Sequence, residues 1–177
     1  MFLDRAVDAY DQPRPRLCGD CTRCLSACPT EAFAAPGVVD SRKCVAYQSI
    51  ENRGSIPEPI RKGFVARVFG CDVCQDVCPY NRKDIPTGDR RFEPRPLAAL
   101  TAAEMAALSE EEFGRLAAGM AVVRTRYDGL RRNALLSLGA SRDRAARAVV
   151  QSLVADPSEI VRESAAWALA QIDRTPT

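Results

Sequence analysis

Residues 18–29 read CGDCTRCLSACP, and this stretch decides the fold of the N-terminal half. Its four cysteines are Cys18, Cys21, Cys24 and Cys28. Three thiolates at two-residue gaps can wrap one loop around three corners of an iron–sulfur cube. The fourth thiolate, just before a proline, points away toward a second cube. The stretch therefore predicts two 4Fe–4S clusters and a loop-rich domain built around them.

A second set of cysteines mirrors the first, with Cys44 followed after 26 residues by CDVCQDVCP at 71–79. The repeated Cys-Pro ending predicts crossed pairing, in which each set lends one ligand to the other set's cluster. We expect the first cluster to be held by Cys18, Cys21, Cys24 and Cys78, and the second by Cys28, Cys44, Cys71 and Cys74. The 26 inserted residues depart from a plain two-cluster ferredoxin and should place something specific beside the second cluster.

The cysteines have two alternative interpretations, a zinc site and disulfides. Zinc sites usually take two separated Cys-x-x-Cys pairs rather than a run of three cysteines closed by Cys-Pro. All eight cysteines lie between Cys18 and Cys78, and histidine is absent from the sequence. The lack of histidine excludes His-based acid–base catalysis and most catalytic zinc sites. We therefore favour two fully liganded 4Fe–4S clusters, which carry electrons and bind no substrate.

The overall composition is that of an ordinary globular protein. The 177 residues carry 25 Lys and Arg against 23 Asp and Glu, and 46% are apolar. This balance excludes a basic tail or an acidic disordered chain. No apolar run approaches the roughly 18 residues of a membrane span, and residues 1–10 lack the apolar segment of a signal peptide. We expect a cytoplasmic protein with no membrane partner, in which clustered cysteines bind metal.

Composition changes along the chain and predicts two domains. Ten of the twelve prolines precede residue 97, and beyond it alanine, leucine and arginine dominate. We expect an α+β fold with a bacterial-type two-cluster ferredoxin domain at 1–84, a linker at 85–96 and an all-α domain at 97–177.

Three apolar faces with a 3.6-residue period run through the C-terminal half. They are Leu130, Ala134, Leu135 and Leu138; Ala145, Val149 and Leu153; and Val161, Ala165, Leu169 and Ile172. Gly139 fits the end of the first helix, and Asp156-Pro157 fits the start of the third. Ser109 fits a helix cap ahead of all three. Short helices in series indicate HEAT-like repeats, with a small helical bundle as the alternative.

With these residues in place, the chain resembles the epoxyqueuosine reductases, cobalamin-dependent iron–sulfur enzymes of tRNA modification. The stretches that carry the resemblance are 18–30, 35–37, 40–57, 69–82, 92–95, 108–113 and 130–134. The pieces IENRGSIP at 50–57 and LRRNA at 130–134 are more specific than the cysteines alone.

The resemblance implies a reaction, the reduction of epoxyqueuosine to queuosine at the wobble position of a tRNA anticodon. In that family the clusters pass electrons to a cobalamin, whose reduced cobalt attacks the epoxide while a carboxylic acid supplies a proton. Family members begin with a cobalamin-binding domain about as long as this chain, so the resemblance implies a C-terminal half without that domain. The acid lies in that domain, so we assign no catalytic residue here. The implied partners are the tRNA anticodon stem-loop, an external electron donor and a cobalamin-binding domain in trans.

The resemblance also places cobalamin against the iron–sulfur domain near the second cluster. By position, the residues at that face are Ala46, Tyr47, Ile50, Glu51, Asp72 and Gln75. Packing around the second cluster is the alternative for all six. For Glu51, a salt bridge with Arg53 is the specific alternative.

A basic segment of the helical half is the expected RNA contact. Between residues 121 and 150, seven arginines stand against Asp128 and Asp143, a net charge of +5. The seven are Arg124, Arg126, Arg131, Arg132, Arg142, Arg144 and Arg147. Arginine forms bidentate pairs with phosphate, so the segment suits an anticodon stem. A solvated helix face is the alternative.

Two rival functions stay open at this point. The chain could be a stand-alone two-cluster electron carrier that docks another redox partner through its helical repeats, or a remnant that binds clusters without acting. The presence of Glu51, Arg53-Gly54 and Arg132-Asn133 favours the reductase interpretation over both rivals, because a plain carrier needs none of these residues. We therefore expect the electron-relay and tRNA-docking part of an epoxyqueuosine reductase, inactive unless a cobalamin-binding domain is supplied.

Overall fold

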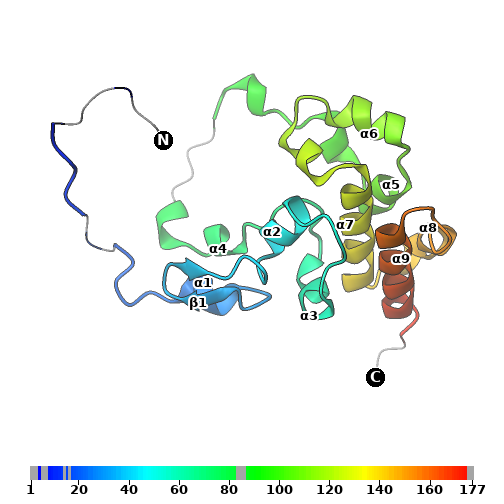
Figure 1. Cartoon of the computed structure of the whole chain (residues 1–177), viewed down its shortest axis with the longest axis horizontal. Helices are drawn as coiled ribbons and strands as arrows, with labels where there is room; N and C mark the ends of the chain where they lie inside the picture. The colour runs from blue at the N-terminus through cyan, green and yellow to red at the C-terminus, as the bar shows by residue number, and fades with distance from the viewer. Residues whose placement is uncertain (1–3, 5–7, 14, 16, 83–86, 175–177) are drawn as a thin grey trace.

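The computed structural model describes residues 4, 8–13, 15, 17–82 and 87–174. Figure 1 shows a cysteine-bearing half beside a helical half. The predicted boundary between residues 84 and 85 lies outside the described residues, as do residues 85 and 86 of the predicted linker.

The cysteine-bearing half consists of short helices, 3-10 turns and one small hairpin. Its elements are α1 (Arg23–Ala27), β1 (Phe33–Ala35), β2 (Val38–Val39), α2 (Val45–Ile50), α3 (Glu58–Arg61), η1 (Lys62–Phe64), α4 (Val73–Asp76) and η2 (Pro79–Asn81). The two strands pair antiparallel, with Phe33 opposite Val39. Helices α1 and α4 bury no residue. Apolar burial therefore does not explain how α1 and α4 pack against each other.

The second half is helical. Its elements are η3 (Arg90–Phe92), η4 (Pro96–Ala99), α5 (Ala102–Ala107), α6 (Glu110–Ala117), η5 (Ala121–Thr125), α7 (Tyr127–Ala140), η6 (Arg144–Ala146), α8 (Arg147–Ser152) and α9 (Glu159–Ile172). The predicted α+β class, mostly helical with one small sheet, is confirmed. Within the described part of the chain, no helix combines the length and the apolar character that a membrane span requires.

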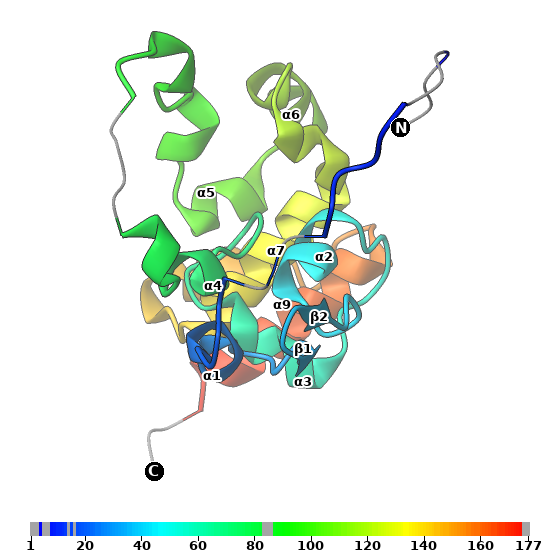
Figure 2. The same ribbon diagram turned by 90° about the vertical axis from the view of Figure 1, so that its left-hand side faces the viewer.

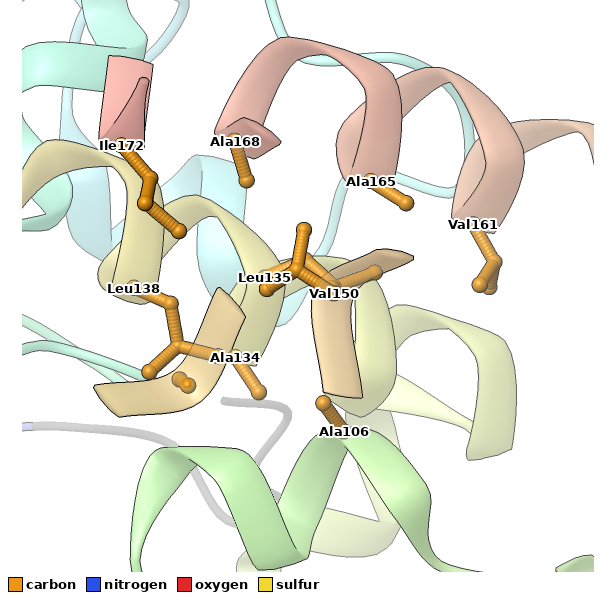
Figure 3. Close-up of a cluster of buried hydrophobic side chains, with 10 residues drawn as sticks. Ala106, Ala134, Leu135, Leu138, Val150, Val161, Ala165, Ala168 and Ile172 are labelled. Carbon is orange, nitrogen blue, oxygen red and sulfur yellow. The ribbon is translucent and has the colours of Figure 1, made fainter. Parts of the chain in front are cut away.

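Helix α7 forms the centre of the helical half. Every residue from 129 to 139 is buried, because α5, α9 and the cysteine-bearing half all pack against this helix. Figure 3 shows Ala165 and Ala168 of α9 pointing toward Leu135 of α7 and Val150 of α8. The predicted first and third apolar faces supply most of this core, with Leu169 half-buried at its edge.

The second predicted apolar face is displaced by one residue at its first two positions, whereas Leu153 packs against the core as expected. Ala145 is exposed, whereas Ala146 and Val150 are buried. The reason is η6, whose three residues per turn shift the phase before α8 begins.

Two predicted helix ends also differ from the structure, and one predicted cap is confirmed. Helix α7 runs one residue past Gly139, and α9 begins after Ser158 rather than at Pro157. Asp156 instead accepts a hydrogen bond from the backbone N–H of Ser158 at 2.9 Å. Ser109 caps α6 in a capping box with Glu112.

The residues between Cys44 and Cys71 fold back onto the helical half; we call them the 45–70 insertion. Ile60 and Phe64 of the insertion share one buried cluster with Leu136 of α7. Accordingly, α2 and α3 lie between the hairpin and α7 in Figure 1. Figure 2 shows α5 and α6 on the opposite side of α7 from α1 and β1. The cysteine-bearing half therefore packs against the helical half through the 45–70 insertion.

Candidate iron–sulfur site

One group of cysteines surrounds a cavity of about 430 Å³. The group comprises Cys18, Cys21, Cys24 and Cys78, the set expected for the first cluster, together with Cys74. Gly19 has a φ of +51°, which glycine adopts without strain and which turns the chain after the first cysteine. The Tyr80 hydroxyl donates a hydrogen bond to the Leu17 carbonyl at 2.7 Å and joins the two ends of this site.

A second, smaller cavity adjoins the first, and Cys74 lines both. Its cysteines are Cys28, Cys44, Cys71 and Cys74, the set expected for the second cluster. The structure thus gathers the eight thiols into the two expected sets, while the ligand assignment itself stays a prediction.

The thiols of the second cavity differ in their electrostatics. Burial on its own raises the pKa of the Cys28 thiol, but hydrogen bonds outweigh it and lower that pKa, with Ala32 N–H donating to the sulfur at 3.3 Å. For Cys74 burial raises the pKa, and the charges of Cys71 and Cys44 raise it further, against a hydrogen bond from Gln75. Thiolates crowded in this way repel one another, and bound iron would remove that repulsion.

The donor set fits an iron–sulfur cube better than a zinc ion or disulfides. All eight cysteines are free thiols. Across the described ranges, no three His, Cys, Asp or Glu side chains converge closely enough to bind a single metal ion. Zinc requires ligands about 2.0–2.3 Å from one point, whereas a cube carries its four thiolates on separate corners.

The two cavities differ in their surroundings. Cys18 and Cys21 are exposed, whereas all four cysteines of the second set are half-buried. Behind the second set, η1 approaches so closely that a Cβ on Gly63 would lie 2.7 Å from the side chains of Thr30 and Val45. The second set is therefore packed against the 45–70 insertion, and through it against α7.

Arg132 is not on the surface, which corrects its prediction as an RNA contact. It is fully buried, and its guanidinium donates hydrogen bonds to the carbonyls of Gln48 (3.0 Å), Asn52 (2.9 Å) and Gly54 (2.6 Å). Burial, with the nearby charge of Arg53, lowers the pKa of Arg132 to about 10, so the group stays cationic at neutral pH.

The neighbouring Asn133 completes this contact, and sequence analysis did not assign it a role. Its amide nitrogen donates to the carbonyls of Ser49 at 2.7 Å and Val68 at 2.9 Å, and its oxygen accepts from Arg132. The signal was present in the LRRNA motif, where an uncharged amide follows two arginines on a helix otherwise rich in small and apolar residues.

Arg131 is also buried, so its prediction as an RNA contact is wrong as well. Its guanidinium pairs with Asp156 and donates to the Ala106 carbonyl at 3.1 Å. It also lies over the Tyr127 ring, 4.9 Å from the ring centroid. Every one of these contacts is within the helical half.

The other five predicted RNA contacts are exposed but do not form one patch. They are Arg124, Arg126, Arg142, Arg144 and Arg147. The first two precede α7 and the other three follow it. Because the fourteen residues of α7 span about 20 Å, the helix separates the two groups by about that distance. Arg147 forms a salt bridge with Asp173, and Arg124 forms one with Glu51.

The residues expected at the cobalamin face fall on two elements. Ala46, Tyr47 and Ile50 share one side of α2, and Tyr47 is 42% exposed. Asp72 and Gln75 are exposed at α4, beside Cys71 and Cys74.

Glu51 follows α2 and has a different partner from the one we considered. The partner of its carboxylate is Arg124, not Arg53. Arg53 instead donates to the carbonyls of Ile50 and Arg124. Glu51 therefore links the expected cofactor face to the arginines that precede α7.

Two protein families match separate parts of the chain. The family described as "4Fe-4S double cluster binding domain" matches residues 17–81, and the HEAT repeat family matches residues 115–177.

Similar whole proteins are epoxyqueuosine reductases. That of Gloeobacter violaceus is 47% identical over 84% of this chain and 50% of the relative. That of Xanthomonas campestris is 40% identical over 97% of this chain and 48% of the relative. The chain thus spans about half the length of the curated relatives it matches.

Solved structures give the same result. A crystal structure of epoxyqueuosine reductase with a tRNA-Tyr epoxyqueuosine-modified stem loop superposes with a TM-score of 0.83 at 32% identity, covering 93% of this chain and 44% of that one. The enzyme from Streptococcus thermophilus gives 0.81 at 30% identity, over 96% of this chain and 45% of that one. The chain is therefore a homologue of the epoxyqueuosine reductases, matching about half of their length with its double-cluster iron–sulfur domain and HEAT repeats.

Proposed function

We propose that this chain is the electron-relay and tRNA-docking part of an epoxyqueuosine reductase, which reduces epoxyqueuosine to queuosine in tRNA. The observation that carries the proposal is the gathering of eight thiols into two adjoining cavities beside HEAT repeats. Support also comes from the likeness to an epoxyqueuosine reductase solved with a modified tRNA stem loop.

The relay needs two groups of cysteines close together, one open to a donor and one near the site of reaction. Cys18 and Cys21 are exposed, as entry of electrons from an external donor requires. Cys44 and Cys71 lie at the inner end, next to α2. Electrons would therefore enter at the first cluster and leave at the second.

The exposed side of α2 is the surface that would meet cobalamin. Tyr47 offers an aromatic face, and Glu51 is oriented by Arg124. Bound cobalamin supplies a strong nucleophile for the strained epoxide ring. We assign no proton donor to this chain, and we expect turnover only when a cobalamin-binding domain accompanies it.

The tRNA would meet the arginines that precede α7 rather than those that follow it. Arg124 pairs with Glu51 at the end of α2, and Arg126 directly follows η5, which contacts α2. Arg142 and Arg144 lie beyond the far end of α7. A substrate base near the cofactor face would therefore bring its phosphates to Arg124 and Arg126.

The test is anaerobic reconstitution followed by an activity assay. The chain should bind about eight irons, and zinc without iron would exclude the relay. The reconstituted chain is then incubated with epoxyqueuosine-containing tRNA, cobalamin and a strong reductant, and nucleosides are identified by mass spectrometry. We expect queuosine only when a cobalamin-binding domain from a homologue is added.

Two other outcomes would change the assignment. Queuosine formed without the added domain would mean that this chain seats cobalamin and finds its own acid. No queuosine in either case, from a chain that holds its iron and is reduced reversibly, would favour the stand-alone electron carrier.

A further inference from the structure

Two residues of α7 hold the backbone on both sides of the second set of cysteines. We propose that Arg132 and Asn133, acting with Ser49, are positioning residues for the second cluster. They fix the Cys44 and Cys71 segments against the helical half and so set the cluster's reduction potential and its stability. The inference rests on the ligand assignment of the proposed function.

On the Cys44 side, the contact is with the end of a helix. Cys44 is the N-cap of α2, which is only six residues long. The carbonyls in the last turn of a helix have no partner within it. Arg132 donates to the Gln48 carbonyl and Asn133 to the Ser49 carbonyl, both in that last turn. A cation at a helix C-terminus also interacts favourably with the helix dipole and so stabilises the helix.

On the Cys71 side, the contact is with the backbone of the three residues before the cysteine. Asn133 donates from the same amide nitrogen to the Val68 carbonyl. The hydroxyl of Ser49, which is fully buried, accepts a hydrogen bond from the Gly70 N–H at 3.0 Å. Gly70 has a φ of +76° and directly precedes Cys71. Asn133 and Ser49 thus hold together two cysteine segments that are separated by 26 residues in the sequence.

The first cluster receives no such support. Among the described residues, no side chain of the helical half hydrogen-bonds to residues 17–31 or 72–82, which carry all four cysteines of the first set and also Cys28 and Cys74. The support from α7 thus reaches the second set through the Cys44 and Cys71 segments alone. The potential of an iron–sulfur cluster depends on its hydrogen-bonded surroundings and on its solvent exposure. A change at Arg132 should therefore affect the second cluster and spare the first, which is an internal control.

The experiment compares three variants of the reconstituted chain under anaerobic conditions. Arg132→Met removes the guanidinium. Ser49→Ala removes one hydroxyl, which accepts from the Gly70 N–H and donates to the Ala46 carbonyl within α2, and this smaller change keeps the test valid if the first variant does not fold. Arg131→Met is the matched control, since Arg131 is a buried arginine on the same helix whose bonds stay within the helical half. EPR-monitored redox titration gives each cluster's midpoint, and a chelator gives its rate of iron release. A Cys21→Ser variant identifies the signal of the first cluster.

We expect Arg132→Met and Ser49→Ala to shift the midpoint of the second cluster and to speed its iron release at least several-fold, while the first cluster is unchanged. Arg131→Met should lower the melting temperature without moving either midpoint. Equal effects of Arg131→Met and Arg132→Met, or unchanged midpoints in both Arg132→Met and Ser49→Ala, would overturn the inference. Far fewer than eight irons in the unchanged chain would instead overturn the ligand assignment beneath it.

Discussion

The buried ion pair of Arg131 and Asp156 fixes the start of α9 against α7. Both side chains are 7% exposed, so removing one partner leaves an uncompensated charge inside the protein. We expect Arg131→Met to lower the free energy of unfolding by about 3–5 kcal/mol. Urea unfolding measures this loss. The double variant Arg131→Met/Asp156→Leu should recover most of it, and a single variant as stable as the wild type would contradict the prediction.

The same pair predicts a dependence of stability on pH. Burial on its own raises the pKa of Asp156, but hydrogen bonds from Arg131 and Ser158 outweigh it and lower that pKa. The folded carboxylate therefore keeps its charge at lower pH than an unfolded one, whose pKa is about 3.9. Its contribution to stability is complete above that value and is lost as the pH falls through the folded pKa.

Asp156→Asn is the variant that tests this pH dependence. Its stability deficit relative to the wild type should be constant between pH 5 and pH 7 and should shrink below about pH 4. Thermal melts across this range measure the difference. Because the two proteins differ only at residue 156, the difference between their melting temperatures reports Asp156. A deficit that grows below pH 4 would contradict the argument.

The contact between α7 and α9 depends on a glycine. A Cβ on Gly139 would lie 2.7 Å from the Ala168 Cα and 2.7 Å from the Trp167 ring, so α9 would have to move. We expect Gly139→Ala to cost about 1–3 kcal/mol. Gly129→Ala on the same helix is the control, since its nearest neighbour is 3.6 Å away. Gly129→Ala should be neutral or stabilising. A Gly139→Ala variant as stable as the wild type would contradict the prediction, because it would show that α9 can move at no cost in stability.

Local signals predicted the elements that depend on local contacts. The capping box of Ser109 and Glu112 needs only residues three apart, and it forms as expected. The apolar face of α8 was misplaced because a 3-10 turn precedes it, and period analysis assumes a continuous α-helix. Burial of Arg131 and Arg132 was missed for a different reason. Helix α7 is packed on several sides, so it has no solvated face on which polar residues must lie.

The thiol sets could be predicted because their spacing is a local property repeated in the sequence. What the 45–70 insertion does could not be, since its contacts are with residues about eighty positions away. Ser55 and Arg61 both bond to Glu163 of α9, and Phe64 packs with Leu136. The insertion therefore packs the cysteine-bearing half against α7 and α9. A plain electron carrier would not need this contact.

The packing of the two halves places α2 beside the start of α7, and from this arrangement we predict which arginines bind RNA. Replacing Arg124 and Arg126 by glutamine should weaken binding of an anticodon stem-loop and lower the slope of log affinity against log salt by about 2, since each removes one phosphate contact. The same change at Arg142 and Arg144 should leave both unchanged, because these residues lie beyond the far end of α7. Arg115→Gln on α6 is a control for general loss of charge. If only the Arg142 and Arg144 changes lowered the slope, the tRNA would dock at the end of α7 away from α2. The exposed side of α2 would then not be the surface that receives the substrate base.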